Sequence, residues 1–242
     1  MILSIQVGGN DTFLSRGFYG AGNYNGGADT DMLDFSQSDA YTDGRRANEG
    51  TGVKVDLLAG KASTYYLRAS NVTWTDANGQ IALTGIENVL GTTQSDLITG
   101  DATANVLDGG ASDVYNRGVI DTLNGEAGND TFLSRGFFGA GIYTGGADTD
   151  LLDFSQSDAY TDGRRANEGA GVKVDLLAGT ASTYYLRASN VTWTDANGQI
   201  TLATIENVRG TNQADSLSGD ASINVLEGGN GADILVGWFR AR

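Results

Sequence analysis

The sequence contains no cysteine, no histidine and no proline. Without cysteine and histidine, the chain has no disulfides, no thiolate or imidazole metal site, and no Ser-His-Asp or Cys-His catalysis. Lysine and arginine are also few, at 15 against 30 aspartates and glutamates, which gives a formal net charge of −15. This balance argues against nucleic-acid partners and favours cations. No apolar run reaches about 18 residues, so we expect no membrane insertion.

Glycine is abundant, at 36 of 242 residues, and it recurs with a period of nine. A polar residue follows five positions after each of these glycines, and a large aliphatic residue comes two positions later. The pattern runs through Gly210, Gly219 and Gly228 near one end, and through Gly91, Gly100 and Gly109 earlier. In "GGASDVYNRGVIDTLNGE" (109–126), seven extra residues precede Asp121. Self-similarity at a fixed step indicates a repeat architecture.

A longer repeat contains this one. Residues 8–110 align without a gap with residues 127–229 at an offset of 119, and 84 of the 103 positions are identical. The chain is therefore a tandem duplication. We predict a first repeat unit over residues 1–110, a connector with an insertion over 111–126, and a second repeat unit over 127–242.

The chemistry of the repeat favours a hard metal ion. Glycines allow several backbone carbonyls to turn toward one point, and the carboxylate adds charge. Calcium accepts six to eight oxygen ligands in forgiving geometry, whereas magnesium is smaller and keeps its waters. We therefore expect each nonapeptide to form a turn followed by a short strand, with the liganding oxygens at the edge and the Leu or Ile side chain in the core. The alternative is that these carboxylates are simply solvated turn residues.

The stretch "GGNGADILV" (228–236) matches the nonapeptide G-G-x-G-x-D-x-U-x, in which U is a large apolar residue. In this feature the chain resembles the RTX (repeats-in-toxin) calcium-binding proteins. The resemblance implies an all-β fold, a parallel β-roll (a right-handed β-solenoid), here tandemly duplicated, with irregular inserted segments and hairpins. It also implies that several calcium ions lie between successive turns, each of which contains two nonapeptides.

Same-edge residues of such a roll are 18 positions apart, as Asp215 and Asp233 are. The pairs Asp96 with Asp121 and Asn105 with Asp130 are 25 apart, which is 18 plus the seven inserted residues. Carboxylates also lie two apart within single turns. The resulting candidate metal ligands are Asp11, Asp29, Asp31, Asp96, Asp101, Asn105, Gly109, Asp121, Gly128, Asp130, Asp148, Asp150, Asp215, Asp220, Asn224, Gly228, Gly229, Gly231 and Asp233.

Residues 36–84 and 155–203 interrupt the nonapeptides. We read "STYYLRASNVTWTDANGQIAL" (63–83) as a strand, an Asn-Gly hairpin turn and a second strand. Aromatic residues gather here in both copies, where they form either a ligand platform for a sugar or a cover for the edge of an open roll. They are Tyr65, Tyr66, Trp74, Tyr184, Tyr185 and Trp193.

The resemblance implies a module that folds on binding Ca²⁺ outside the cell, as part of a larger protein that bacteria export by type I secretion. An acidic chain without metal repels itself, so metal binding becomes folding free energy. We expect no enzyme activity, because the sequence offers no catalytic motif. The alternatives are a carbohydrate- or surface-binding module of an adhesin or S-layer-like protein on the bacterial cell surface, and an accessory module of a secreted polysaccharide-modifying enzyme.

Overall fold

A computed structural model describes residues 8–15, 22–37, 51–66, 75–110, 120–135, 140–157, 170–185 and 194–238. All regular secondary structure in these ranges is β-strand, and the 20 strands form two sheets. Within the same ranges there is no helix that is long and apolar enough to cross a membrane. The prediction of an all-β chain is confirmed.

The eight-stranded sheet consists of strands of two or three residues. Their order across the sheet is β1 (Thr12–Leu14), β3 (Met32–Asp34), β7 (Asn88–Leu90), β9 (Val106–Asp108), β11 (Thr131–Leu133), β13 (Leu151–Asp153), β17 (Asn207–Arg209) and β19 (Leu226–Glu227). Every neighbouring pair in this sheet is parallel.

The twelve-stranded sheet lies opposite and mixes parallel and antiparallel pairs. Its order is β2 (Gly22–Asn25), β6 (Thr75–Thr84), β5 (Lys61–Tyr66), β4 (Thr51–Asp56), β8 (Leu97–Thr99), β10 (Ile120–Ala127), β12 (Ala140–Ala147), β16 (Thr194–Ala203), β15 (Thr180–Tyr185), β14 (Ala170–Asp175), β18 (Ser216–Ser218) and β20 (Ile234–Val236).

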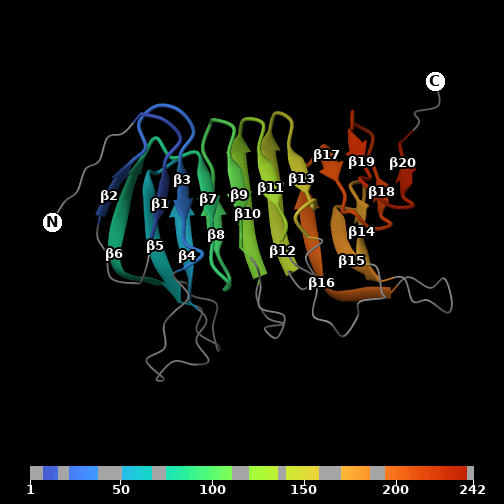
Figure 1. Cartoon of the computed structure of the whole chain (residues 1–242), viewed down its shortest axis with the longest axis horizontal. Helices are drawn as coiled ribbons and strands as arrows, with labels where there is room; N and C mark the ends of the chain where they lie inside the picture. Colours follow the sequence, from blue (N-terminus) through green and yellow to red (C-terminus); the bar gives the residue numbers. More distant parts are fainter. Residues whose placement is uncertain are drawn as a thin grey trace.

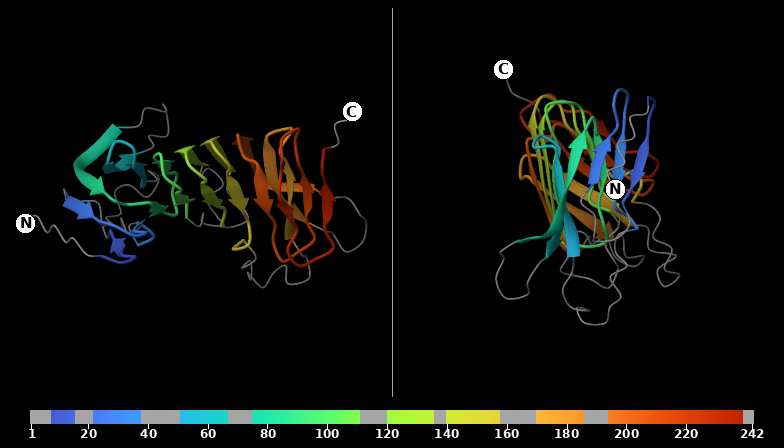
Figure 2. Two further views of the ribbon diagram at one scale, coloured as in Figure 1. Left: turned by 90° about the horizontal axis from the view of Figure 1, so that it is seen from above. Right: turned by 90° about the vertical axis from the view of Figure 1, so that its left-hand side faces the viewer.

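From β7 to β13 the chain alternates strictly between the two sheets, so each pair of consecutive strands makes one coil of a stack. The strands lie across the long axis of the molecule, from β1 and β2 at one end to β20 at the other (Figure 1). Seen from above, the coils follow one another along this axis (Figure 2). Both sheets continue from the first sequence copy into the second, because β9 pairs with β11 and β10 pairs with β12.

Each copy carries a three-stranded antiparallel meander in the twelve-stranded sheet. In the first copy β4 pairs with β5 and β5 with β6, while β4 and β6 pair in parallel with β8 and β2 on either side. A meander with an odd number of strands returns the chain in its original direction, so it fits into a parallel sheet. Strands β14, β15 and β16 repeat this arrangement in the second copy.

The predicted Asn-Gly hairpin turn is wrong. Asn78 and Gly79 lie inside β6, where the pairing with β5 shifts register between Ala62 and Thr64. Asn and Gly tolerate the irregular backbone of a bulge as well as that of a turn. Strands β5 and β6 do pair antiparallel, as the predicted hairpin requires, and the residues that join them, 67–74, lie outside the described residues. A separate hairpin turn joins β4 to β5 at residues 57–60, where Gly60 has a φ of +64° and donates its N–H to the Leu57 carbonyl.

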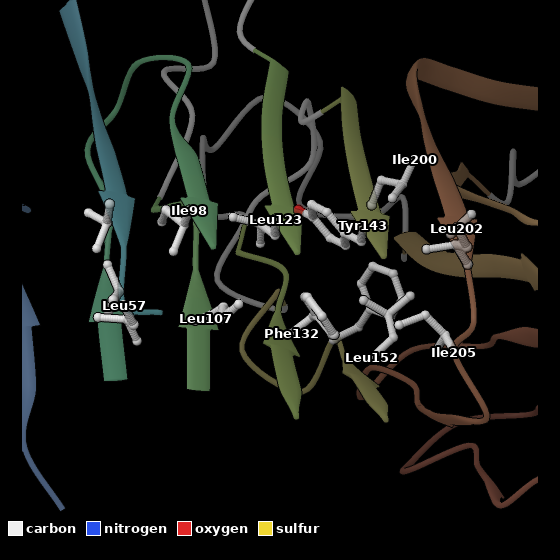
Figure 3. Close-up of a cluster of buried hydrophobic side chains, with 14 of the residues drawn as sticks. Leu57, Ile98, Leu107, Leu123, Phe132, Tyr143, Leu152, Ile200, Leu202 and Ile205 are labelled. Carbon is white, nitrogen blue, oxygen red and sulfur yellow. The ribbon is translucent and has the colours of Figure 1, made fainter. Parts of the chain in front are cut away.

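The core lies between the sheets and consists mainly of the middle residue of each short strand (Figure 3). Ile98, Leu107, Leu123 and Phe132 are 0% exposed. Each of them follows the polar repeat residue by two positions, as side-chain alternation requires. Leu235 differs, since it is 49% exposed on β20, beyond which no described strand packs.

Candidate metal-binding edges

Two rows of polar residues run along the stack, one at each edge. The first edge contains the polar residues at the start of the strands of the eight-stranded sheet, each one position before its strand except Asn224, which lies two positions before β19. They are Asp11, Asp31, Glu87, Asn105, Asp130, Asp150, Glu206 and Asn224. The second edge belongs to the twelve-stranded sheet and contains Asp96, Asp215 and Asp233, directly before β8, β18 and β20, and Asp121, the second residue of β10.

Hydrogen bonds join neighbouring coils along the first edge. The Asp11 N–H donates to Asp31 Oδ1 over 2.7 Å, and the Asp130 N–H donates to Asp150 Oδ1 over 2.9 Å. The predicted pair is also brought together, because the Asn105 N–H donates to Asp130 Oδ1 over 2.8 Å. Each carboxylate therefore reaches back to the backbone of the preceding coil.

The second edge brings its predicted pairs together in the same way. The Asp96 N–H donates to Asp121 Oδ1 and the Asp215 N–H donates to Asp233 Oδ1, each over 3.0 Å. The spacings of 25 and 18 residues therefore do place these side chains on adjacent coils.

The carboxylates of Asp96 and Asp215 are already well supplied with protein donors. Asp96 accepts from the Val53 N–H at 2.6 Å, from the Thr92 N–H at 2.7 Å and from the Thr92 hydroxyl at 3.1 Å. The duplicate Asp215 accepts from the equivalent three donors on Val172 and Thr211. A carboxylate that is satisfied by three donors has less need of a cation, so the second edge is the weaker metal candidate.

The first edge has the opposite character, because four of its carboxylates keep one buried oxygen without a hydrogen-bond partner. These oxygens are Asp11 Oδ2, Asp31 Oδ2, Asp130 Oδ2 and Asp150 Oδ2. Asp31 and Asp150 are 0% exposed and Asp130 is 1% exposed. A buried carboxylate oxygen without a partner is destabilising unless something positive lies beside it.

Backbone carbonyls converge on the same points. A Cβ atom placed on Gly125 would overlap both Asp130 Oδ2 and the Gly145 carbonyl oxygen of the next coil. The space beside Gly145 is crowded in the same way by Asp150 Oδ2 and the Thr204 carbonyl oxygen. Glycine leaves this space open, and two hard oxygen donors face it. The residues present therefore fit a calcium ion.

Burial and like charge act against ionisation on this edge. Burial, followed by the charge of Asp150, raises the pKa of Asp130 to about 7. Burial, followed by the charges of Glu206 and Asp148, raises the pKa of Asp150 to about 6. On the second edge, burial and then the charge of Asp96 raise the pKa of Asp121 well above its usual value. A bound cation would reverse these shifts.

Both polar atoms of each asparagine side chain on the first edge have protein hydrogen-bond partners. The Asn105 side-chain amide donates to the Glu87 carbonyl oxygen over 2.9 Å, and its Oδ1 accepts from the Asp101 N–H over 2.8 Å. Asn224 makes the same two bonds with Glu206 and Asp220. The amide N–H₂ group thus donates to a backbone carbonyl oxygen, whereas an aspartate at this position would place a carboxylate oxygen against that carbonyl oxygen.

Other predicted ligands lie in the turns around these rows. Asp29 and Asp148 are exposed and accept from the Gly9 and Gly128 N–H groups of the preceding coil. Asp101 and Asp220 accept from backbone N–H groups within their own turns. The glycines among them either adjoin a carboxylate or have positive φ, and they are Gly109, Gly128, Gly228, Gly229 and Gly231.

The aromatic platform is only partly within the described residues. Tyr65 and Tyr66 end β5, and Tyr184 and Tyr185 end β15. Trp74 and Trp193 lie outside the described residues. A sugar-binding role for these residues remains a prediction.

Two glutamates lie outside the nonapeptides but occupy the position that the polar residue of a nonapeptide would take. Glu87 and Glu206 precede the buried Val89 and Val208 by two residues, just as Asn105 precedes Leu107. That spacing was the signal for them in the sequence. The Asp31 N–H donates to Glu87 Oε2 over 2.8 Å, and the Asp150 N–H donates to Glu206 Oε2 over 2.9 Å.

These stacked parallel coils, with glycine turns and buried carboxylates in rows along two edges, define a repeat protein of the β-roll kind. A model of the RTX calcium-binding nonapeptide repeat matches residues 81–113, 120–138 and 209–239, in four copies. The chain therefore carries RTX calcium-binding repeats, as its sequence predicts. Asp31 and Asp150 lie outside the matched residues. No curated protein matches the chain.

Proposed function

We propose that this chain is a calcium-dependent folding module, a β-roll that assembles when it meets Ca²⁺ outside the bacterial cell as part of a larger protein exported by type I secretion. The observation that carries the proposal is the row of buried, unpartnered oxygens on Asp31, Asp130 and Asp150. They face glycine spaces that backbone carbonyls also line.

The energetics support coupling between metal and fold. Neighbouring coils lie about 4.8 Å apart, so ionised carboxylates on successive coils repel each other by about 1 kcal/mol in water and by more where they are buried. A net charge of −15 adds a general repulsion that opposes compaction. Calcium between the coils would replace both penalties with attraction, and extracellular calcium modules bind at roughly 10⁻⁴–10⁻³ M.

A calcium titration from chelator, followed by far-UV circular dichroism, tests the proposal. We expect a gain of β signal at about millimolar calcium or below, with no comparable gain in magnesium. The paired variant Asp130→Asn with Asp150→Asn should require several-fold more calcium. The matched control is Asp153→Asn, because Asp153 lies at the opposite end of β13 from Asp150 and pairs with Arg209. A full β spectrum in chelator that does not respond to calcium would contradict the proposal.

A further inference from the structure

Glu87 and Glu206 occupy places on the first edge that the nonapeptides do not supply. Each follows the last strand of an inserted meander, β6 or β16, and directly precedes a strand of the eight-stranded sheet. Their partners on the preceding coil are Asp31 and Asp150, which are 56 residues earlier rather than 18 or 20. After each meander, the chain therefore returns to the same position on the first edge that it would reach after an ordinary coil.

The contacts at this junction are reciprocal. Glu87 Oε2 accepts from the Asp31 N–H over 2.8 Å, and the Glu87 N–H donates to the Asp31 carbonyl over 3.2 Å. The side chain of Asp31 is 0% exposed, with Oδ1 bonded to the Asp11 N–H and Oδ2 without a partner. Two carboxylates thus lie on adjacent coils, and the Asp31 carboxylate has a buried oxygen without a hydrogen-bond partner.

A backbone carbonyl completes the arrangement in both copies. Asp31 Oδ2 and the Gly85 carbonyl oxygen both crowd the space beside Gly26. In the second copy, Asp150 Oδ2 and the Thr204 carbonyl oxygen crowd the space beside Gly145.

The direction of that carbonyl is kept despite strain. Gly85 has a φ of +55°, and the residue that replaces it, Thr204, has a φ of +50°. Positive φ is unfavourable for a β-branched residue, whereas glycine adopts it freely. The second copy therefore holds its carbonyl in the same direction although threonine resists that backbone conformation.

From this geometry we infer that Glu87 and Glu206 each complete a divalent-cation site of their own at the return of the meander. The first site consists of the Asp31 carboxylate, the Glu87 carboxylate and the Gly85 carbonyl, and the second consists of Asp150, Glu206 and the Thr204 carbonyl. No three acidic side chains of the described residues converge on one point. Each ion would therefore draw on the carbonyl and on water for its remaining ligands, as Ca²⁺ does.

The next coil marks the end of each run of ions. The Asn105 amide donates to the Glu87 carbonyl oxygen, and the Asn224 amide donates to the Glu206 carbonyl oxygen, each over 2.9 Å. An N–H₂ group at this place repels a cation. Each glutamate site is therefore the last one before a position without metal. Its two carboxylates flank an inserted segment, residues 36–84 in the first copy and 155–203 in the second.

This inference rests on the proposed function, and ion counting separates the two. The number of Ca²⁺ ions bound per chain can be measured by native mass spectrometry and by competition with a chromophoric chelator. We expect Glu87→Gln and Glu206→Gln each to lose one ion, and the double variant to lose two. The control Glu227→Gln should lose none, because Glu227 is exposed and pairs with Arg209.

Glutamine keeps an acceptor for the Asp31 and Asp150 N–H groups, so the fold should persist at saturating calcium. An unchanged ion count in the double variant would overturn the inference and leave the proposed function intact. A wild-type chain that binds no calcium would overturn both.

A second measurement follows the wild-type chain, and the variants Glu87→Gln, Glu206→Gln and Glu227→Gln serve only to assign its signals. The chain has six glutamates, so carboxyl-¹³C labelling of glutamate gives six NMR signals. At saturating calcium, exchange of Ca²⁺ for Cd²⁺ should move the signals of Glu87 and Glu206. The Glu227 signal should stay in place, and a spectrum in which no glutamate signal moves would contradict the assignment.

Discussion

The close approach at Gly125 offers a test of the metal site that separates packing from ion binding. Alanine at this position would put a methyl group against Asp130 Oδ2 and the Gly145 carbonyl oxygen. Gly125 does not have a positive φ, so the backbone itself accepts alanine. Gly22 is the matched control, because it lies in β2 with nothing within 4 Å of a Cβ atom placed there.

The expected magnitude has two parts. Overpacking costs about 1–3 kcal/mol, and the reduced entropy of the unfolded chain returns about 0.4–1 kcal/mol. This part does not depend on calcium. Each ion that binds only the folded state adds about 1.4 kcal/mol for every tenfold rise in free calcium above its Kd. Losing one site therefore lowers the slope of stability against log calcium by about 1.4 kcal/mol per decade.

Urea unfolding at a series of free calcium concentrations, followed by circular dichroism, measures both parts. We expect Gly125→Ala to have a lower intercept and a lower slope than the wild type. Gly22→Ala should have the wild-type slope and an intercept higher by about 0.5 kcal/mol. If the lines of Gly125→Ala and the wild type are parallel, no ion uses this space and the reasoning about the glycine positions fails.

Three further predictions concern the edges and the core. Asn105→Asp removes the amide donor to the Glu87 carbonyl and should lower the free energy of unfolding in urea by about 1–3 kcal/mol. The control Asn129→Asp keeps an acceptor for the Thr149 N–H and should change the stability little. Equal effects of the two variants would contradict the role given to the Asn105 amide. Phe132 is 0% exposed, and its ring stacks on the Tyr143 ring with the centroids 6.0 Å apart. We expect Phe132→Ala to lower the free energy of urea unfolding in calcium by about 3–5 kcal/mol, and Ile142→Ala, at a residue that is 46% exposed, to lower it by less than about 0.5 kcal/mol. In chelator, the folded state should lose stability as pH rises from about 4 to about 7, because the pKa of Asp130 is raised to about 7 and that of Asp150 to about 6, so the folded state keeps protons that the unfolded chain has released. At about 1.4 kcal/mol per pKa unit the limit for Asp130 is about 4 kcal/mol, and we expect about 2 kcal/mol after solvent screening. The β signal of circular dichroism in chelator reports the folded fraction; a signal that grows over this pH range, or one that Asp130→Asn leaves just as pH-dependent, would refute the prediction.

The repeated parts of the fold could be predicted from the sequence because their spacing carries the geometry. A polar residue followed two positions later by an aliphatic residue gives one short strand with a buried centre, as Ile98 and Leu123 show. The spacings of 18 and 25 residues correctly place Asp215 beside Asp233 and Asp96 beside Asp121. What the spacing could not reveal is which carboxylate oxygens remain without donors, because this depends on neighbours such as Thr92 and Val53.

The inserted segments could not be predicted in the same way. Asn78 and Gly79 suit a turn and a bulge equally well, and the choice depends on long-range pairing. Strand β6 has to pair with β5 on one side and with β2 on the other, so it continues through these residues with a register shift. No local pattern in residues 63–83 contains that information.

The meander also explains why the first edge survives such a long interruption. Three antiparallel strands bring the chain back to the edge from which an ordinary coil would leave, whereas two or four would leave it at the opposite edge. Strand β6 therefore ends beside β2, and Glu87 begins the next coil directly above Asp31. The length of the insertion is then free, while the position of the glutamate is fixed. A carboxylate at this point restores the row of acidic residues on the first edge after 56 residues, so the row that we propose to bind metal continues past the insertion.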